Sequence, residues 1–246
     1  GVKRDTHPAT ADHCVRAFAG LAEWFKKRDA NRHHQLFNAA RRVLYAWKNH
    51  LRRECEPDIM LDALLALARV DPSPEWRDLA AQGLSLLLSR QVRGPCFGQN
   101  RITGFFVREE KPDENESFRG RGGRNLFRYA RRVRQLSRAL LLWPKHQDAG
   151  RWKDGLVLLL EGCLEPMIRL NPFRVLPACL CLDTDPIPGA RPLEGRLRFR
   201  YFGIEAEGNN GELAQAAEAF GLAARALETP HWASFGQKQI DWIFGF

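Results

Sequence analysis

The sequence lacks any apolar run of the roughly 18–20 residues that a membrane-spanning helix needs. One of its longest apolar stretches, residues 59–70, is interrupted by Asp62 and Arg69. We therefore expect no membrane-spanning segment. The first residues, Gly1 to Asp5, include no initiating Met and no apolar core of a signal peptide. Either a signal has been removed or the chain is a piece of a longer protein.

Several short motifs that carry chemistry are also missing. The sequence contains no Gly-rich phosphate loop, no HExxH and no GxSxG, and its six cysteines form no CxxC pair. The closest two are Cys179 and Cys181, and a zinc site would need further paired ligands at suitable spacing. We expect no metal or cofactor, and we expect most cysteines to be buried free thiols that pack as small hydrophobes. Asp183 and Asp185 are interpreted as part of a turn before Pro186.

Strand-like alternation is scarce, and its one candidate is residues 197–202. Apolar residues recur instead at helical spacing through most of the chain. The predicted helices cover residues 15–25, 36–51, 59–70, 76–87, 126–142, 152–168, 211–227 and 232–244. The predicted fold class is therefore all-α.

The junctions between these helices resemble one another. An acid ends one helix, and a ring follows four or five residues later: Asp29–His33, Asp71–Trp76, Asp148–Trp152 and Glu228–Trp232. Ser73-Pro74 and Thr229-Pro230 suggest an N-cap followed by a proline in the first turn. Such recurrence indicates an array of antiparallel helical hairpins, in which the rings lock each hairpin.

Two long stretches, residues 92–124 and 171–208, are rich in Gly, Pro and charge and have little periodicity. Long loops of this kind in a compact domain are usually functional or disordered. Because alternate loops of a hairpin array emerge on the same face, we expect these two to border a substrate cleft.

The formal charge is +9, and arginine is concentrated in one stretch. That stretch contains Arg119, Arg121, Arg124, Arg128, Arg131, Arg132, Arg134 and Arg138. The residues 119–124 are similar to a short RGG element that binds nucleic acid. We favour a solvated basic helix face, because Leu126, Ala130 and Val133 form an apolar stripe opposite the arginines. Nucleic acid is thus an unlikely partner, whereas an acidic polysaccharide would suit the charge.

The C-terminal stretch has the most specific pattern. Gly208-Asn209-Asn210-Gly211-Glu212-Leu213 leads into an Ala-rich helix, and Gln239-Ile240-Asp241-Trp242-Ile243-Phe244-Gly245-Phe246 ends the chain. These residues resemble the late part of glycoside hydrolase family 9, the endoglucanase and cellodextrinase type. The likeness covers about forty C-terminal residues closely, the first ninety loosely and the middle not at all.

The resemblance implies an incomplete α/α toroid of the six-hairpin glycosidase type, formed as a single domain by residues 1–246. It also implies inverting hydrolysis of O-glycosyl bonds in a β-linked glucan or related polysaccharide, which needs two carboxyls roughly 6.5–9.5 Å apart. The family's Gly-Gly-Trp-x-Asp-Ala-Gly-Asp motif does not occur in the sequence, and its late Glu would follow the last residue. We therefore expect the catalytic carboxylates outside this chain.

Candidate sugar-binding residues are Tyr201, Asn209, Asn210 and Glu212. Tyr201 is equally a stacking platform or a core residue, whereas Phe199 and Phe202, like Phe105 and Phe106 in the first long loop, are favoured as core. The residues 209–212 read as a helix cap with an acid in the first turn. In the resembled family, however, this turn borders the cleft, so one of them would also bind sugar hydroxyls.

One alternative from a different class stays open. A noncatalytic helical-repeat module would bind an anionic polymer or a protein through the Arg-rich face. A different six-hairpin enzyme, a lyase or an epimerase, would also fit the helical pattern.

Overall fold

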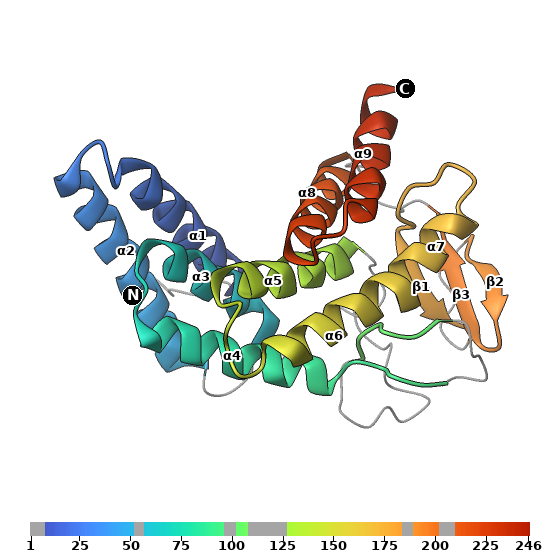
Figure 1. Ribbon diagram of the computed structural model, residues 1–246, viewed down its shortest axis with the longest axis horizontal. Coiled ribbons are helices and arrows are strands. Elements are labelled where there is room, and N and C mark those ends of the chain that lie inside the picture. The colour runs from blue at the N-terminus through green and yellow to red at the C-terminus, as the bar shows by residue number, and fades with distance from the viewer. Residues whose placement is uncertain (1–7, 52–56, 96–101, 108–126, 184–188, 202–209) are drawn as a thin grey trace, which may run out of the picture. The chain divides into compact units, whose positions relative to one another are not determined.

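The computed structural model describes residues 8–51, 57–95, 102–107, 127–183, 189–201 and 210–246 (Figure 1). Helices dominate these residues, as the sequence predicts, and every predicted helix is present, although the first two begin several residues earlier than predicted. The prediction of a mostly α-helical protein is confirmed. None of the described helices is long and apolar enough to cross a membrane. The chain divides into two compact units, residues 1–87 and residues 88–246.

The first unit is built from helices joined by short turns. They are α1 (Pro8–Phe25), α2 (Ala30–Leu51), α3 (Pro57–Val70) and most of α4 (Pro74–Ser89). Helix α1 packs against both α2 and α3. Its contact face carries Val15, Ala19 and Ala22, which are fully buried, and small residues at this spacing let neighbouring helices approach closely.

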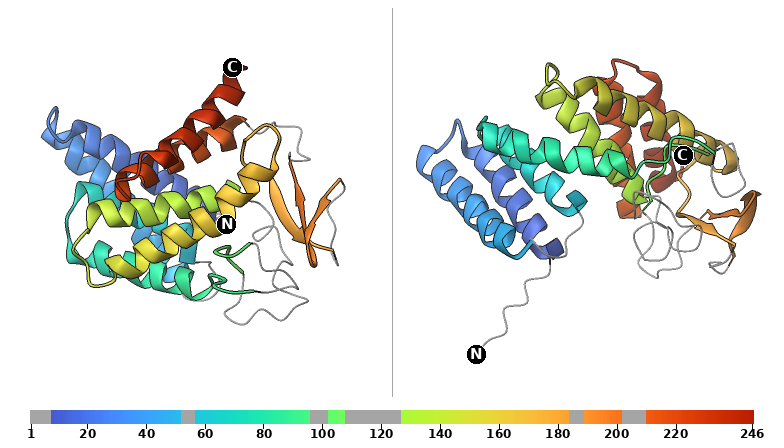
Figure 2. Two further views of the ribbon diagram at one scale, coloured as in Figure 1. Left: turned by 45° about the vertical axis from the view of Figure 1, so that its right-hand side comes forward. Right: turned by 90° about the horizontal axis from the view of Figure 1, so that it is seen from below.

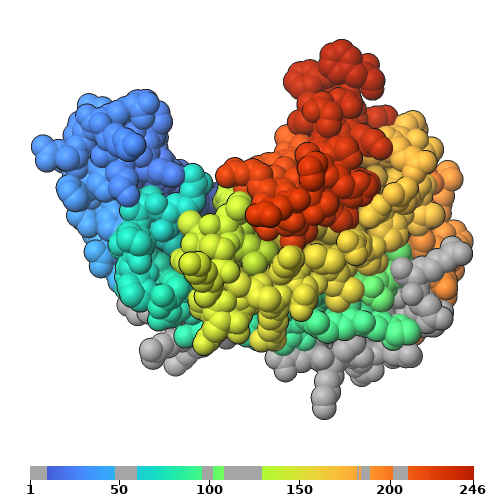
Figure 3. Space-filling view, in the orientation of Figure 1, coloured from blue at the N-terminus to red at the C-terminus, as the bar shows by residue number. Residues whose placement is uncertain are grey.

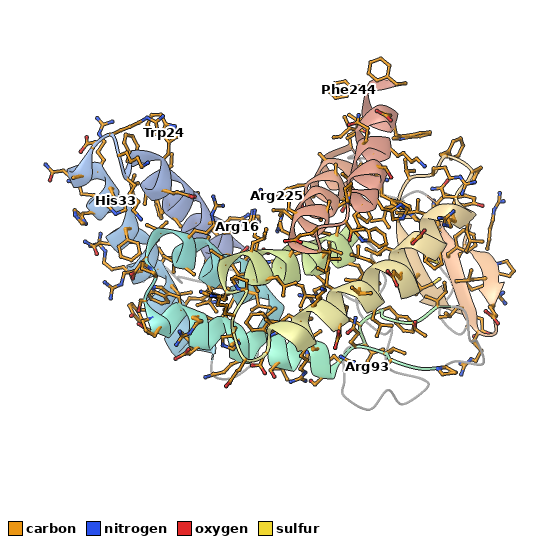
Figure 4. The ribbon with its side chains drawn as sticks, in the orientation of Figure 1. Arg16, Trp24, His33, Arg93, Arg225 and Phe244 are labelled. Atoms are coloured by element: carbon orange, nitrogen blue, oxygen red, sulfur yellow. The ribbon has the colours of Figure 1, made fainter. Side chains whose placement is uncertain are left out.

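Side chains at two junctions of the first unit fasten its hairpins. Asp29 caps α2 by accepting a hydrogen bond from the Arg32 N–H at 3.0 Å. The ring of His33 lies 2.9 Å from the carbonyl of Ala22 on α1, and the Trp76 indole N–H donates to the Asp71 carboxylate at 3.0 Å. The predicted packing of Trp76 within a hairpin is therefore confirmed, whereas His33, interpreted from the sequence with His34 as a solvated or capping pair, contacts the preceding helix. Figure 4 shows His33 at the end of the hairpin where α1 connects to α2.

The second unit contains α5 (Phe127–Leu142), α6 (Ala149–Leu159), the π-helical turn η1 (Leu160–Leu164), α7 (Glu165–Leu170), α8 (Asn210–Ala226) and α9 (His231–Phe244). Helix α5 packs on α6 and α8, and α8 packs on α9 (Figure 2). Trp152 and Trp232 are buried at the starts of α6 and α9, which confirms the prediction that these rings pack within hairpins.

Helices α6 and α7 form one continuous rod that is widened by η1 at its centre. The widened turn frees the carbonyl of Gly162, which accepts a hydrogen bond from the Thr103 N–H at 2.9 Å. A Cβ at Gly162 would lie only 2.5 Å from the Thr103 hydroxyl oxygen, so this close approach requires glycine. Pro166 lies in the first turn of α7, directly after η1, where its missing N–H costs little.

A small antiparallel sheet lies beside α7, with strand order β1-β3-β2 (Figure 1). Its strands are β1 (Cys179–Leu182), β2 (Arg191–Glu194) and β3 (Leu197–Arg200). Strand β3 confirms the one predicted strand, but the prediction of an unstructured loop over residues 171–208 is wrong where β1 and β2 form. Strand β1 shows no alternation because Cys179, Leu180 and Cys181 are all buried. Strand β2 carries Pro192, a residue that argues against a strand in a sequence.

Candidate functional site

The most ordered candidate site lies where the loop after α7 meets α9. Two buried amides build this loop. Asn171 donates to the Val175 carbonyl at 2.9 Å, and its own side-chain oxygen accepts from the Phe173 N–H at 3.0 Å. Gln239 on α9 accepts from the Leu176 N–H at 2.9 Å and donates to the Phe235 carbonyl at 3.1 Å. Because both amides are fully buried and bonded, the loop has a fixed position on α9.

This loop presents an aromatic pair to the surface. The rings of Phe173 and Trp242 lie 4.9 Å apart between centroids, with an interplanar angle of 57°. Phe173 is 48% exposed and Trp242 is 37% exposed. Two large rings that stay exposed while their backbone is fixed are suited to contact the apolar face of a ligand. We call these two residues the aromatic pair.

Tyr201 lies next to the same loop. Its hydroxyl is 3.5 Å from the carbonyl of Leu170, the last residue of α7. Its ring packs edge-on against Phe199 at 5.2 Å and lies 5.2 Å below the guanidinium of Arg191. Tyr201 is therefore half-buried and held by contacts on both sides.

A small pocket opens between the same elements. It has a volume of about 90 Å³ and is lined by Ile168, Arg169, Arg174, His231, Ser234, Phe235 and Lys238. Figure 3 shows the surfaces of α7 (yellow) and α9 (red) adjoining there. We call this the basic pocket, because three of its side chains are permanent cations and a fourth is an imidazole.

The charges of the basic pocket are only partly neutralised. The carboxylate of Glu165 pairs with the Arg169 guanidinium, whose Nε lies 2.9 Å away, and it lies 3.6 Å from the His231 ring. Arg174 donates to the Arg169 carbonyl at 3.2 Å. Lys238 lies over the Phe235 ring at 5.8 Å and has no ion-pair partner among the described residues. The pocket therefore carries a net positive charge.

Arg174 occupies an unusual backbone conformation for its residue type. Its φ is +56°, in the left-handed region that a residue with a Cβ adopts only at a cost. The Arg174 N–H donates to the Asn171 carbonyl at 2.9 Å, which holds the turn in place. The cost is therefore met by the surrounding loop, and the turn aims Phe173 and Arg174 at α9.

The predicted sugar-binding residues lie in different parts of the second unit. The hydroxyl of Tyr201 lies near the Leu170 carbonyl, just before the loop that carries Phe173. Asn210 is the first residue of α8 and is exposed, and Glu212 is half-buried in its first turn, as predicted for an acid at a helix start. Asn209 lies outside the described residues. Among the described contacts, none joins Tyr201 to Asn210 or Glu212, so the structure does not assemble the predicted set into one cluster.

The predicted core phenylalanines are confirmed where they are described. Phe105, Phe106 and Phe199 are buried. Phe202 lies outside the described residues. Most of the described cysteines also follow the prediction, because Cys163, Cys179 and Cys181 are buried and form no disulfide, whereas Cys14 is half-buried. Burial raises the pKa of the Cys163 thiol well above its usual range.

The interpretation of α5 as a solvated basic face is wrong for Arg134. Its side chain is only 7% exposed, and its guanidinium lies 3.5 Å from the Glu218 carboxylate on α8. Arg138 binds the other oxygen of Glu218 at 2.7 Å. Helix α5 packs between other helices, so its apolar stripe is not its only buried face. The RGG-like residues 119–124 and the side chain of Arg128 lie outside the described residues.

The first unit offers two polar clusters. One is a shallow pocket of about 540 Å³ along α2, lined by Gln35, Asn38, Arg41, Arg42 and Tyr45. Two contacts hold its central residues in place. Tyr45 donates to Glu75 at 2.8 Å, and the Arg41 guanidinium lies 5.7 Å from the Tyr45 ring. The Tyr45 hydroxyl raises the pKa of Arg41, and Asp71 and Glu75 raise it further, so Arg41 stays charged.

The other cluster joins α1 to α3. The buried carboxylates of Asp12 and Asp62 lie 3.5 and 3.9 Å from one guanidinium nitrogen of Arg16. Because one cation serves both buried carboxylates and joins two helices, we interpret this cluster as a structural ion-pair network. Among the described residues, no group of His, Cys, Asp or Glu side chains could hold a metal ion.

The basic pocket and the aromatic pair are absent from the sequence-based predictions. Their residues lie far apart in the chain, and the only local signal is a polar and aromatic row on α9 at four-residue spacing, Ser234, Lys238 and Trp242. Trp242 of that row meets Phe173 because the Gln239 amide fixes the loop on α9, and the sequence gives no sign of this contact. Compared with known proteins, the chain matches no protein-family model and no curated protein sequence.

Proposed function

We propose that this chain is the scaffold and part of the sugar-binding surface of a family 9-like glycoside hydrolase. The proposal includes a toroidal arrangement of the hairpins, of which the described helices supply an incomplete set. Its substrate is a β-linked glucan or a related polysaccharide. No carboxylate of this sequence matches the family's catalytic motif, so the proposal assigns none of them as the catalytic acid or base.

The aromatic pair is the observation that carries the proposal. Sugar rings expose apolar C–H faces, which pack on aromatic rings, while their hydroxyls need polar partners at the edge. Phe173 and Trp242 offer such rings, and Tyr201 adds a ring with a hydroxyl. Trp242 also belongs to the Gln-Ile-Asp-Trp motif on which the family resemblance rests. The neighbouring Gln239 of that motif fixes the loop that carries Phe173.

Binding of tetrasaccharides to the purified 246-residue chain tests this proposal. One probe is cellotetraose, and a second is the matched tetrasaccharide of β-linked glucuronate. We expect at least one to bind and to change tryptophan fluorescence. Trp242→Ala should weaken that binding by about threefold to tenfold, which corresponds to the roughly 0.5–1.5 kcal/mol of one aromatic contact. No hydrolysis is expected from this chain, because both carboxyls are needed for it.

Trp24→Ala is the matched control. Trp24 is 53% exposed on α1 and is the other strongly exposed tryptophan of the described residues, so it reports on nonspecific stacking. The control variant should bind as the parent chain does. The proposal fails if neither tetrasaccharide binds, or if both tryptophan variants lose binding equally. Robust hydrolysis by the parent chain would show that a catalytic pair lies within it.

A further inference from the structure

We propose that the basic pocket binds an oxyanion substituent of the sugar whose ring packs on the aromatic pair, so that the substrate is an acidic glycan. The substituent is a carboxylate or a sulfate. This inference rests on the proposed function, because it names the substrate class for the same surface.

The volume of the pocket suits a substituent better than a whole ligand. Its space of about 90 Å³ is several times the roughly 10–15 Å³ that one water needs, so a group of a few heavy atoms fits. It is much smaller than the roughly 300–1,000 Å³ of pockets that enclose a complete small molecule. The remainder of the ligand must therefore lie outside, on the adjoining surface.

The chemistry of the lining selects an anion. Arg169, Arg174 and Lys238 donate only. Glu165, which lies beside the pocket, is the one carboxylate that pairs with its lining residues among the described ion pairs. Of the neighbouring acids, Asp241 on α9 already accepts a hydrogen bond from Gln237 at 2.7 Å. The Ser234 hydroxyl donates to the His231 carbonyl at 2.7 Å and keeps its lone pairs. One acid against three permanent cations leaves charge for an external oxyanion.

The position of the pocket connects it to the sugar surface. Lys238 and Trp242 are four residues apart on α9, so they lie on one face, about 5–6 Å apart along the helix. Arg174 directly follows Phe173 in the fixed loop. Each element therefore contributes one ring and one cation. A pyranose packed on the rings would carry an acidic substituent of its own ring toward the cations.

The test compares three tetrasaccharides with the same β-linked backbone: cellotetraose, the glucuronate form and a sulfated form. We expect an acidic form to bind about tenfold or more tightly than cellotetraose at low salt, in line with hydrogen bonds to charged groups. Whichever of the two acidic forms binds more tightly identifies the substituent. Added salt should remove this preference but leave binding of the neutral form largely unchanged.

Substitutions separate the pocket from general charge. Lys238→Gln and Arg174→Gln should each weaken acidic binding by about tenfold, with little change for cellotetraose. Lys153→Gln, which removes an equal charge from an exposed position on α6, should change acidic binding less than twofold. Glu165→Gln should strengthen acidic binding about threefold, because it removes the negative charge beside the pocket.

The outcomes distinguish this inference from the proposed function. Equal affinity for neutral and acidic forms, or acidic binding that Lys238→Gln and Lys153→Gln reduce alike, would overturn the inference and leave sugar binding by the aromatic pair intact. Absence of binding to all three probes would overturn both. The gain expected from Glu165→Gln keeps the test decisive even if a loss variant folds poorly.

Discussion

Two groups of basic side chains in the second unit have opposite surroundings. On α5, Arg134 and Arg138 converge on one carboxylate, Glu218, and Arg134 is almost completely buried. In the basic pocket, Arg174 and Lys238 come from different elements, remain open to solvent and have no ion pair among the described residues. The dense arginine cluster of the sequence is thus partly structural, whereas dispersed cations form the pocket.

This difference shows that charge density along a sequence is a poor guide to a binding surface. What makes a cation available to a ligand is the absence of a counter-ion and sufficient exposure, and both depend on tertiary packing. Arginines on α5 are spaced so that a neighbouring helix must cover some of them. Residues 174 and 238 are brought together only because the loop after α7 folds onto α9.

The largest expected effect concerns the buried residues around α5 and is a loss of stability at alkaline pH. Tyr129 on α5 donates to the Phe106 carbonyl at 3.2 Å and is fully buried. Burial raises the pKa of Tyr129 and of Cys163 well above their usual range, and the nearby Cys163 raises that of Tyr129 further. The folded state therefore keeps both protons when the unfolded chain would release them.

The sign of the effect follows from that difference. Above the unfolded thiol pKa of about 8.5, unfolding releases a proton, so the free energy of unfolding falls by about 1.4 kcal/mol per pH unit, or about 3 kcal/mol by pH 10.5. Denaturant unfolding between pH 7 and 10.5 measures it. Cys163→Ala should lower the slope below pH 10, where Tyr129 begins to contribute. If the free energy of unfolding does not change up to pH 10.5, water must reach the Cys163 and Tyr129 side chains in the folded protein.

The next effect tests the ion pairs directly. Glu218→Gln should lower the free energy of unfolding by about 1–2 kcal/mol, because it leaves the buried Arg134 without that carboxylate. The value is below that of a fully buried pair, since Glu218 itself is 44% exposed. Glu165→Gln is the matched control on the pocket side, with an expected loss below about 0.5 kcal/mol. Equal losses would remove the contrast between the two groups.

Local patterns predicted most of the fold. Helical periodicity placed every helix, and the acid-to-ring junctions predicted that Trp76 would lock a hairpin, which it does by donating to Asp71. These features depend on residues close in sequence. The small sheet was missed in part because its strands are only four residues long, and β1 is buried on both faces.

The candidate site was much less predictable. Tyr201 was identified because it is an aromatic residue shortly before the turn at residues 208–213, which the family resemblance places at the cleft. Phe173, Arg174 and Lys238 gave no such signal. They meet because Asn171 fixes the loop internally and the Gln239 amide on α9 binds that loop over a long sequence distance. The solvated interpretation of Arg134 failed for a related reason: a helix pattern shows where apolar residues lie, but it does not show that a second helix covers the polar face.

The smallest expected effect separates the charge of Arg174 from its backbone. Arg174→Gln keeps a Cβ at a φ of +56° and should leave stability nearly unchanged, since the side chain is exposed and forms no ion pair among the described residues. Arg174→Gly relieves the left-handed strain of roughly 1 kcal/mol but adds flexibility to the unfolded chain, so the net gain should be about 0.5 kcal/mol or less.

Both variants remove the same cation, so both should lose the preference for the acidic tetrasaccharide to the same extent. Thermal unfolding and tetrasaccharide titration on the two proteins measure these quantities side by side. If Arg174→Gly retains the preference while Arg174→Gln loses it, the turn conformation rather than the guanidinium would govern binding. If Arg174→Gly is clearly destabilised, the arginine side chain must stabilise the loop, and the contrast with Arg134 would be smaller than the geometry indicates.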